Sequence, residues 1–138
     1  MEKQETSIGA IVINSKNKIL LILKRKSDYW EFPKGHMEGA EDELITMERE
    51  VKEETGINKF KLIEGFRHEE NYSFEKDGEH SNKKVVFYLI KTDDKIHISL
   101  EHKDYMWVDY DEALKMVSYP EQKNTLNRLK AFLENFAK

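Results

Sequence analysis

The stretch from residue 35 to residue 57, GHMEGAEDELITMEREVKEETGI, decides how the rest of this 138-residue chain is interpreted. Between residues 42 and 55, apolar side chains recur at the spacing of one helix face, on the stripe of Leu44, Met47 and Val51. Gly56 follows, and glycine is the residue most often found just past the carboxyl end of a helix. We therefore predict a loop followed by an amphipathic helix that ends before Gly56.

This helix carries a cluster of carboxylates. Glu50, Glu53 and Glu54 stand at positions i, i+3 and i+4, so they project from one face. Such acids repel one another unless a cation lies among them, and hard oxygen ligands suit Mg²⁺ or Mn²⁺ better than Zn²⁺. A glutamate-rich helix face is more often a solvated surface, but these three acids lack lysines four residues further on, and the helix follows a Pro-Lys-Gly loop. We therefore predict a divalent-metal site.

The remaining pattern alternates strands with helices, which predicts a mixed sheet covered by helices. Short apolar or β-branched runs predict strands at residues 7–14, 19–24, 61–66, 84–90 and 105–108. Helical spacing predicts helices at residues 110–117 and 121–136. Residues 28–36 are expected to form a loop because Pro33 and Gly35 disfavour regular structure, and the polar residues 68–83 are expected to join two strands.

Composition narrows the class of protein. The length fits one domain spanning residues 1–138. The net charge of −4 argues against broad binding to a polyanion, although a metal ion reverses the field locally for a small anionic ligand. The chain has no cysteine, which excludes disulfides and thiolate metal sites. No apolar run indicates a signal peptide or a membrane span, so we expect a cytoplasmic protein without a membrane partner.

The motif of the opening stretch resembles that of a known family. Gly35, Glu41 and residues 49–57 match the Nudix box, G-x5-E-x7-R-E-U-x-E-E-x-G-U with U apolar, at every fixed position. The resemblance implies an α/β fold, an α/β/α sandwich with a mixed β-sheet and a loop–helix–loop catalytic motif. It also implies hydrolysis of a pyrophosphate bond in a nucleoside polyphosphate. The three clustered acids would bind Mg²⁺ together with the carbonyl of Gly35, while Glu41 and Arg49 would support the motif.

Segments outside the box resemble the asymmetric diadenosine tetraphosphate hydrolases within that family. Residues 30–36, WEFPKGH, are similar to their W-x-x-P-K-G-H segment, and residues 101–107, EHKDYMW, are similar to a later one. This resemblance implies cleavage of diadenosine tetraphosphate to ATP and AMP. The substrate-binding candidates are Lys34, His36 and Lys84 for phosphate, and Tyr72 and Tyr105 for stacking on a base.

The identity of the general base stays open. Glu53, Glu54 and Glu101 are the catalytic candidates, and Glu101 is also a candidate metal ligand from the loop before a strand. The choice between Glu54 and Glu101 as the base requires geometry. His102 is expected to lie near the site.

Three other functions compete with this assignment. The same acids and metal would serve an RNA 5′-triphosphate pyrophosphohydrolase, whose partner is an RNA 5′ end, although a net acidic chain disfavours RNA. A house-cleaning nucleoside triphosphate pyrophosphatase is a further alternative. A module that only binds nucleotides is disfavoured because every box carboxylate is present. Oligomeric state, the number of metal ions and the role of residues 68–83 are left open.

Overall fold

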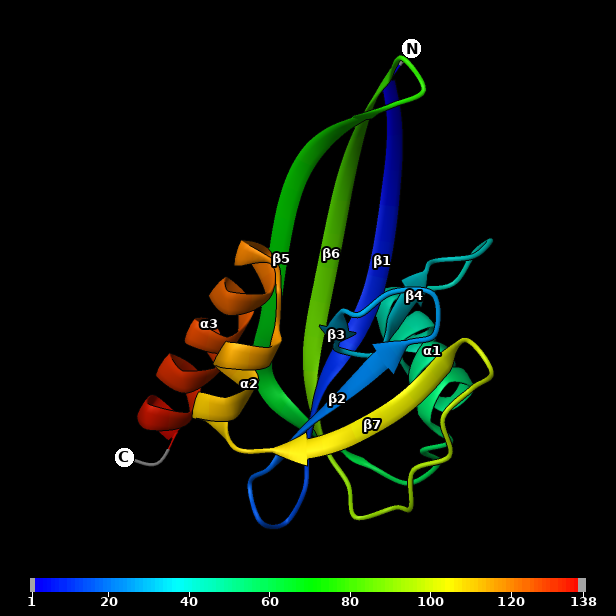
Figure 1. Cartoon of the computed structure of the whole chain (residues 1–138). Coiled ribbons are helices and arrows are strands. Elements are labelled where there is room, and N and C mark those ends of the chain that lie inside the picture. The colour runs from blue at the N-terminus through cyan, green and yellow to red at the C-terminus, as the bar shows by residue number, and fades with distance from the viewer. Residues whose placement is uncertain (1, 137–138) are drawn as a thin grey trace.

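The computed structural model describes residues 2–136, which form strands and helices in the order of a mixed α/β domain (Figure 1). The strands are β1 (Glu2–Ile13), β2 (Ile19–Lys24), β3 (Trp30–Glu31), β4 (Lys34–His36), β5 (Lys61–Lys76), β6 (Glu79–Lys91) and β7 (His102–Val108). The helices are α1 (Glu43–Thr55), α2 (Tyr110–Met116) and α3 (Pro120–Phe136). No helix among the described residues is long and apolar enough to cross a membrane.

The sheet is mixed, as predicted. Its order is β3-β2-β1-β6-β5, with β4 added beside β1 and β7 beside β2. The long β1 runs parallel to β6 from the pair Glu2↔His80 to the pair Ile13↔Lys91. The β2–β7 and β5–β6 pairs are antiparallel. A parallel pair at the centre with antiparallel pairs on both sides requires the chain to cross over between β1 and β6, and α1 lies in that crossover.

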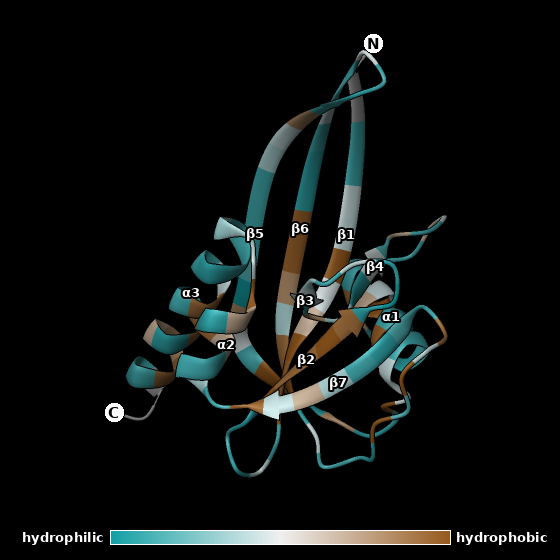
Figure 2. Ribbon diagram, viewed as in Figure 1, coloured by the Kyte–Doolittle hydropathy of each residue, from teal (hydrophilic) through white to brown (hydrophobic). Residues whose placement is uncertain are grey.

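Two hydrophobic cores lie on opposite faces of this sheet. Ile11 of β1 packs in a core that includes residues of α2 and α3, whereas its neighbours Ala10 and Val12 pack in a core that includes residues of α1. Because successive side chains of a strand point to opposite faces, this division places α1 on one face and α2 and α3 on the other. Figure 2 shows the apolar residues gathered along β2 and the adjoining parts of β1 and β6. The predicted α/β/α sandwich is confirmed.

The prediction for residues 68–83 was wrong, because they belong to a long hairpin. β5 and β6 pair from Arg67↔Tyr88 to Lys76↔Glu79, and the turn at Asp77 and Gly78 has positive φ angles of 54° and 76°. Positive φ at both central residues is the requirement of the tight turns that join twisted strands. The many charges in this stretch concealed its period of two. Figure 1 shows the hairpin and the start of β1 extending well past the helices.

The prediction of an irregular loop at residues 28–36 was also wrong in part. Lys34–His36 form the short strand β4, which pairs with β1 through Ser7↔His36 and Gly9↔Lys34. The carbonyl of Pro33 accepts a hydrogen bond from the amide of Ala10 at 3.1 Å, so the proline takes part in pairing as an acceptor. A proline at the start of an edge strand costs no sheet hydrogen bond. The consequence is that the loop entering α1 is fixed against the central strand.

Helix α1 confirms the prediction made from the opening stretch, with one difference. The side chain of Asp42 caps it by accepting from the amide of Ile45 at 2.9 Å, and Gly56 ends it with φ of 76°. Met47 and Val51 are buried, but Leu44 is 42% exposed, so the apolar stripe is shorter than predicted. The buried part of the stripe holds α1 on the sheet, and the acidic face of the helix lies against the loop, with Glu50 and Glu54 buried.

Candidate active site

A cleft made of two adjacent pockets runs across the sheet. The pockets have volumes of about 620 Å³ and 730 Å³. Both are lined by the same four charged residues: Lys24, Glu31, Lys34 and Lys83. The first, called here the aromatic pocket, adds Tyr29, Tyr72, Phe74, Phe87 and Tyr119. The second, the acidic pocket, adds Glu38, Glu50, Glu53, Glu54 and Glu101. Three lysines therefore lie where an aromatic region meets an acidic one.

The acidic pocket collects the three carboxylates predicted on α1. Glu50 and Glu54 are buried, whereas the side chain of Glu53 is 57% exposed. Arg49 lies among them, because its Nη1 donates to Oε1 of Glu50 at 2.7 Å and lies 3.4 Å from the Glu53 oxygens. Among residues 2–136, no three His, Asp or Glu side chains already converge as a metal-binding group. The acids thus share one pocket while their negative charges are balanced in part by arginine.

Glu41 and Arg49 connect the loop to the helix, which fits the supporting role predicted for them. The Nε and Nη2 atoms of Arg49 donate to the two carboxylate oxygens of Glu41 at 2.7 Å and 2.9 Å. Nη2 also donates to the carbonyl of His36 at 2.9 Å. These hydrogen bonds from Arg49 hold the pKa of Glu41 at about 2. A carboxylate that stays charged at all working pH values keeps the loop and α1 in a fixed relation.

The aromatic pocket has walls from three distant parts of the chain. Tyr29, in the loop before β3, and Tyr119, before α3, have ring centroids 5.2 Å apart. Tyr72 and Phe74 of β5 form a second ring pair with centroids 6.4 Å apart. The predicted stacking residue Tyr72 therefore lies in the cleft, while Tyr29 and Tyr119 are additional aromatic side chains that the sequence motifs did not single out. Flat rings on two walls suit an aromatic ligand.

Lys34 lies in the cleft. Lys84 does not, and its neighbour Lys83 lies there instead. Lys34 and Lys83 line both pockets, but Lys84 lines neither. Successive strand residues face opposite ways, so Lys83 shares the side of Val85 and Phe87. The expectation for Lys84 rested on the family resemblance. The strand was expected to begin at residue 84, whereas β6 begins at Glu79 and includes both lysines. Burial lowers the pKa of Lys83, and the nearby Lys34 adds to this effect.

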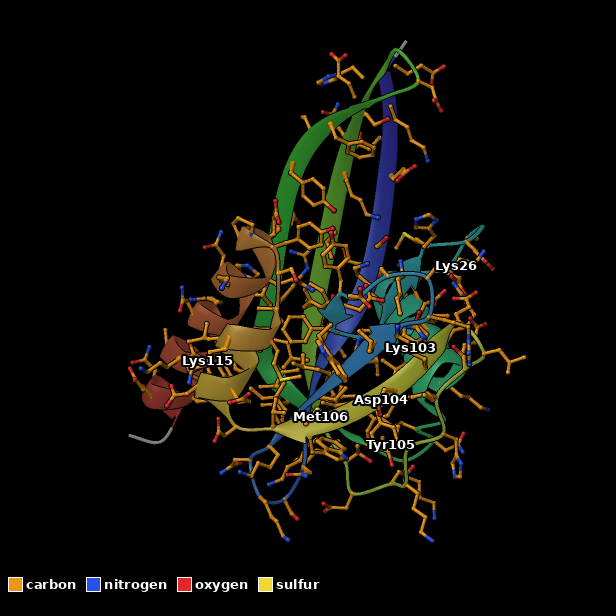
Figure 3. The ribbon with its side chains drawn as sticks, in the orientation of Figure 1. Lys26, Lys103, Asp104, Tyr105, Met106 and Lys115 are labelled. Carbon is orange, nitrogen blue, oxygen red and sulfur yellow. The ribbon has the colours of Figure 1, made fainter. Side chains whose placement is uncertain are left out.

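His36 and Glu101 line the acidic pocket, and Tyr105 lies elsewhere. Glu101 comes from the loop before β7, as predicted, and lines the pocket together with the acids of α1. Tyr105, labelled in Figure 3, is 38% exposed on β7 and lines neither pocket. It pairs with Ile22, whose side chain belongs to the core under α1. Tyr105 therefore lies on the sheet face away from the aromatic pocket, contrary to the expectation that it faces the cleft.

A family model described as the NUDIX domain matches residues 3–129. The chain belongs to the Nudix family. It is 39% identical over 123 residues to the rat protein named bis(5′-nucleosyl)-tetraphosphatase [asymmetrical], a match that covers 83% of this chain and 81% of the rat protein.

The solved structure of a Nudix relative has the same fold. The crystal structure of a C. elegans Ap4A hydrolase in a binary complex matches with a TM-score of 0.79 and 27% identity, over 95% of this chain and 98% of that chain. The RNA pyrophosphohydrolase of Ruthia magnifica is less similar to this chain than the rat protein is. It is 27% identical over 125 residues, which cover 79% of this chain and 70% of that relative. The chain is thus a Nudix hydrolase.

Nudix hydrolases generally use divalent metal ions, and the residues of the acidic pocket fit such an ion. Burial raises the pKa of Glu54 to about 8, and the nearby carboxylates of Glu31 and Glu50 contribute to the increase. A cation would relieve this concentration of buried acid. A Cβ atom on residue 35 would overlap the carboxylate of Glu50, so a larger residue there would displace this carboxylate from its place beside the loop. The oxygen donors, with no sulfur among them, match the chemistry of a hard divalent ion.

Two residues at the site were not fully predicted from the sequence. Glu31 was not considered, and His102 was expected only to lie near the site. Glu31 lines both pockets and is buried, and its Oε2 lies 3.2 Å from Nε2 of His102, which is 1% exposed. His102 lies beneath the cleft, near the site as expected. The pKa of Glu31 is lowered from its usual value despite its burial, because His102 shares a hydrogen bond with it and Lys34 lies close by. A charged residue between the apolar Trp30 and Phe32 was the available signal for Glu31.

Proposed function

We propose that this Nudix hydrolase cleaves a dinucleoside tetraphosphate, diadenosine tetraphosphate giving ATP and AMP, with Mg²⁺ as the ion and Mn²⁺ as its alternative. The observation that carries the proposal is the continuity of the cleft, in which the aromatic and acidic pockets share Lys24, Lys34 and Lys83. A nucleoside with a long polyphosphate has matching features in the same order: an aromatic base, then phosphates that pair with lysines, then phosphates that bind a metal ion. The named function of the rat relative supports the same substrate class. We also infer that residues 1–138 form one domain.

In this proposal the aromatic pocket holds one nucleobase. Tyr72 provides one ring face and the Tyr29–Tyr119 pair lies on another wall. Stacking requires only a π-face, so it accepts any base and gives affinity without strong base selection. The base thereby fixes where the polyphosphate begins.

The lysines then guide the phosphates toward the acids of α1. Lys83 stands directly across the β5–β6 pair from Tyr72, so a phosphate next to a stacked nucleoside meets this ammonium group first. Lys34 and Lys24 lie on the remaining path into the acidic pocket, and His36 is a further donor to phosphate oxygen at its edge. Charge-assisted hydrogen bonds of this type hold a polyanion strongly.

At the acidic pocket, Glu50, Glu53, Glu54 and the carbonyl of Gly35 would hold the metal ion, with Glu101 added from the loop before β7. A divalent ion bound there would neutralise phosphate oxygens and lower the pKa of water. The oxygen of water forms a bond to phosphorus, and the bond from that phosphorus to the bridging oxygen breaks. Glu53, Glu54 or Glu101 accepts the proton that water loses. Arg49 and Glu41 keep the loop and helix in place during this step.

Product analysis tests this assignment. The purified protein is incubated with Mg²⁺ and diadenosine tetraphosphate, and the nucleotides are separated by ion-exchange chromatography. We expect equal amounts of ATP and AMP. Two molecules of ADP per substrate would contradict asymmetric cleavage, and no turnover of the dinucleotide would contradict the substrate class.

Parallel reactions with triphosphorylated RNA and with ATP address the competing substrates. The RNA pyrophosphohydrolase relative favours RNA as the second candidate, while the net charge of −4 opposes it. Release of pyrophosphate or phosphate from RNA at a higher kcat/KM than cleavage of the dinucleotide would reverse the order of these two assignments.

A further inference from the structure

The loop that carries Glu101 is fastened by a residue outside the Nudix box. Arg25, just past the end of β2, donates from its backbone amide to the carbonyl of Glu101 at 2.8 Å. Its Nε donates to the carbonyl of Leu100 at 2.8 Å, and its Nη2 to the carbonyl of His102 at 3.4 Å. One arginine thus holds three consecutive carbonyl groups of residues 100–102.

Other hydrogen bonds attach the two ends of this loop, and the amide of His102 donates to the carbonyl of Ser99 at 3.1 Å, which closes a turn between them. The amide of Ser99 donates to the carbonyl of Glu54 at 3.1 Å, so the first end is tied to α1. At the other end His102 is buried, with Nδ1 3.2 Å from Oγ of Ser99 and Nε2 near Glu31. Between them, Leu100 is 88% exposed and Glu101 is also exposed. Burial therefore does not fix the middle of the loop. Besides the turn from Ser99 to His102, it is held by Arg25, whose backbone amide binds the carbonyl of Glu101 and whose side chain binds the carbonyls of Leu100 and His102.

We propose that Arg25 is a positioning residue that holds the backbone of residues 100–102 so that the carboxylate of Glu101 faces the acidic pocket. The role of Glu101 rests on the function proposed above. The planar fork of an arginine suits the task, because it presents several N–H groups in a fixed arrangement, whereas a lysine offers one nitrogen on a flexible stem. An outer partner that orients a ligand commonly affects affinity or rate by about 10- to 100-fold.

Hydrogen exchange in the metal-free protein tests the fastening without any assumption about substrate. Backbone amides in a peptide spanning residues 98–103 are compared in the wild type, Arg25→Ala and Lys26→Ala. Lys26, labelled in Figure 3, is the next residue and is also exposed, so the control removes the same charge from the same loop. We expect faster exchange in this peptide for Arg25→Ala and wild-type exchange for Lys26→Ala. Equal exchange in all three proteins would overturn the proposal, whatever the enzyme hydrolyses.

Kinetics with diadenosine tetraphosphate and binding of Mn²⁺ test whether the fastening acts through Glu101. Arg25→Ala should lower kcat and weaken Mn²⁺ binding by about 10-fold, with little change in KM, and Arg25→Lys should restore part of the loss. In the Glu101→Gln background, Arg25→Ala should change kcat less than about 2-fold, because the effects of residues that act through the same group are not additive. A raised KM with unchanged kcat would instead make Arg25 a direct substrate contact and would overturn the proposal.

The outcomes separate this proposal from the assignment of substrate. If the wild type does not cleave the dinucleotide, the proposed function fails while hydrogen exchange and Mn²⁺ binding still decide the role of Arg25. If Arg25→Ala does not fold by circular dichroism, Arg25→Lys and Arg25→Gln serve in its place, since each keeps a long side chain over the same loop. Wild-type exchange in both of these folded variants would overturn the proposal.

Discussion

The two pockets of the cleft are built in different ways. Most acids of the acidic pocket come from one continuous segment, residues 38–54, and are fixed by hydrogen bonds within it, above all those of Arg49. The aromatic pocket is built by Tyr29, Tyr72 and Tyr119, which lie far apart in the chain and meet only because the sheet and α3 bring them together. A short motif therefore contains most of the acids of the first pocket, whereas the second pocket is a product of the whole fold.

In the proposed function, this difference separates chemistry from substrate choice. The acidic pocket would supply the elements common to cleavage of any pyrophosphate bond, and its motif is readable from a single sequence. The aromatic pocket would bind the group attached to the phosphates, and its walls include a loop, a hairpin and the start of a helix. Variants in the two pockets should accordingly affect different kinetic constants.

The largest effect is expected in the acidic pocket. Glu53→Gln and Glu54→Gln each remove a charge that the proposed metal site requires, so kcat should fall by about 100-fold or more while circular dichroism shows an intact fold. Glu48→Gln, on the exposed side of the same helix, is the matched control and should retain wild-type kcat. Wild-type turnover in both of the first two variants would refute the assignment of this pocket as the metal site.

Lys83 and its neighbour Lys84 allow a direct comparison, because only Lys83 lies where the two pockets meet. Lys83→Ala removes an ammonium group from the cleft and should raise KM for the dinucleotide by about 10-fold, the equivalent of one charge-assisted hydrogen bond. Lys84→Ala removes the same charge from the opposite face and should change KM little. Steady-state kinetics of the two proteins at one ionic strength decide the matter. A larger effect at Lys84 would contradict the placement of these side chains.

In the aromatic pocket, loss of a single ring should have a more modest effect. Tyr72→Leu keeps apolar surface but removes stacking, so KM should rise by about 5-fold, near the lower limit for a lost base–aromatic contact. Tyr105→Leu is the control, because Tyr105 lies outside both pockets. If Tyr105→Leu raises KM more than Tyr72→Leu does, then the nucleobase binds on another face of the sheet.

The errors made from sequence follow the same division between local and distant contacts. The helix was predicted from residue 42 to residue 55 and lies at Glu43–Thr55, and its end at Gly56 was predicted correctly, because apolar spacing and a terminal glycine are local signals. The hairpin at residues 68–83 was missed because its partly buried side is interrupted by charges such as Lys83 and Glu70, which hide the period of two. Tyr105 was assigned to the cleft because strand alternation reveals that two faces exist but not which face holds a site. That information lies in the pairing of β7 with β2.

The smallest effect concerns the contact that ties α1 to the hairpin. Glu43, at the start of α1, accepts from Nε and Nη2 of Arg67 at 2.9 Å each and from the hydroxyl of Tyr88 at 2.6 Å. The hydrogen bond from Arg67, with a further one from Tyr88, lowers the pKa of Glu43 from 4.5 to about 2. A lowered pKa in the folded state means that the charged carboxylate stabilises the fold above pH 4.5 and that this contribution is lost as the pH falls toward 2.

Glu43→Gln should therefore lower Tm at pH 7. The decrease should be only about 2–4 °C, because the contact is partly solvent-exposed and screening reduces its energy. The difference in Tm between the variant and the wild type should be constant from pH 8 down to about 5 and should then shrink at pH 4 and pH 3. Glu48→Gln, on the same helix, should show no such pH-dependent difference. Thermal unfolding, followed by circular dichroism at each pH, measures the difference in Tm between each variant and the wild type. A difference that grows on acidification would mean that Glu43 is not held as a carboxylate by Arg67, and that α1 is joined to the hairpin by packing alone.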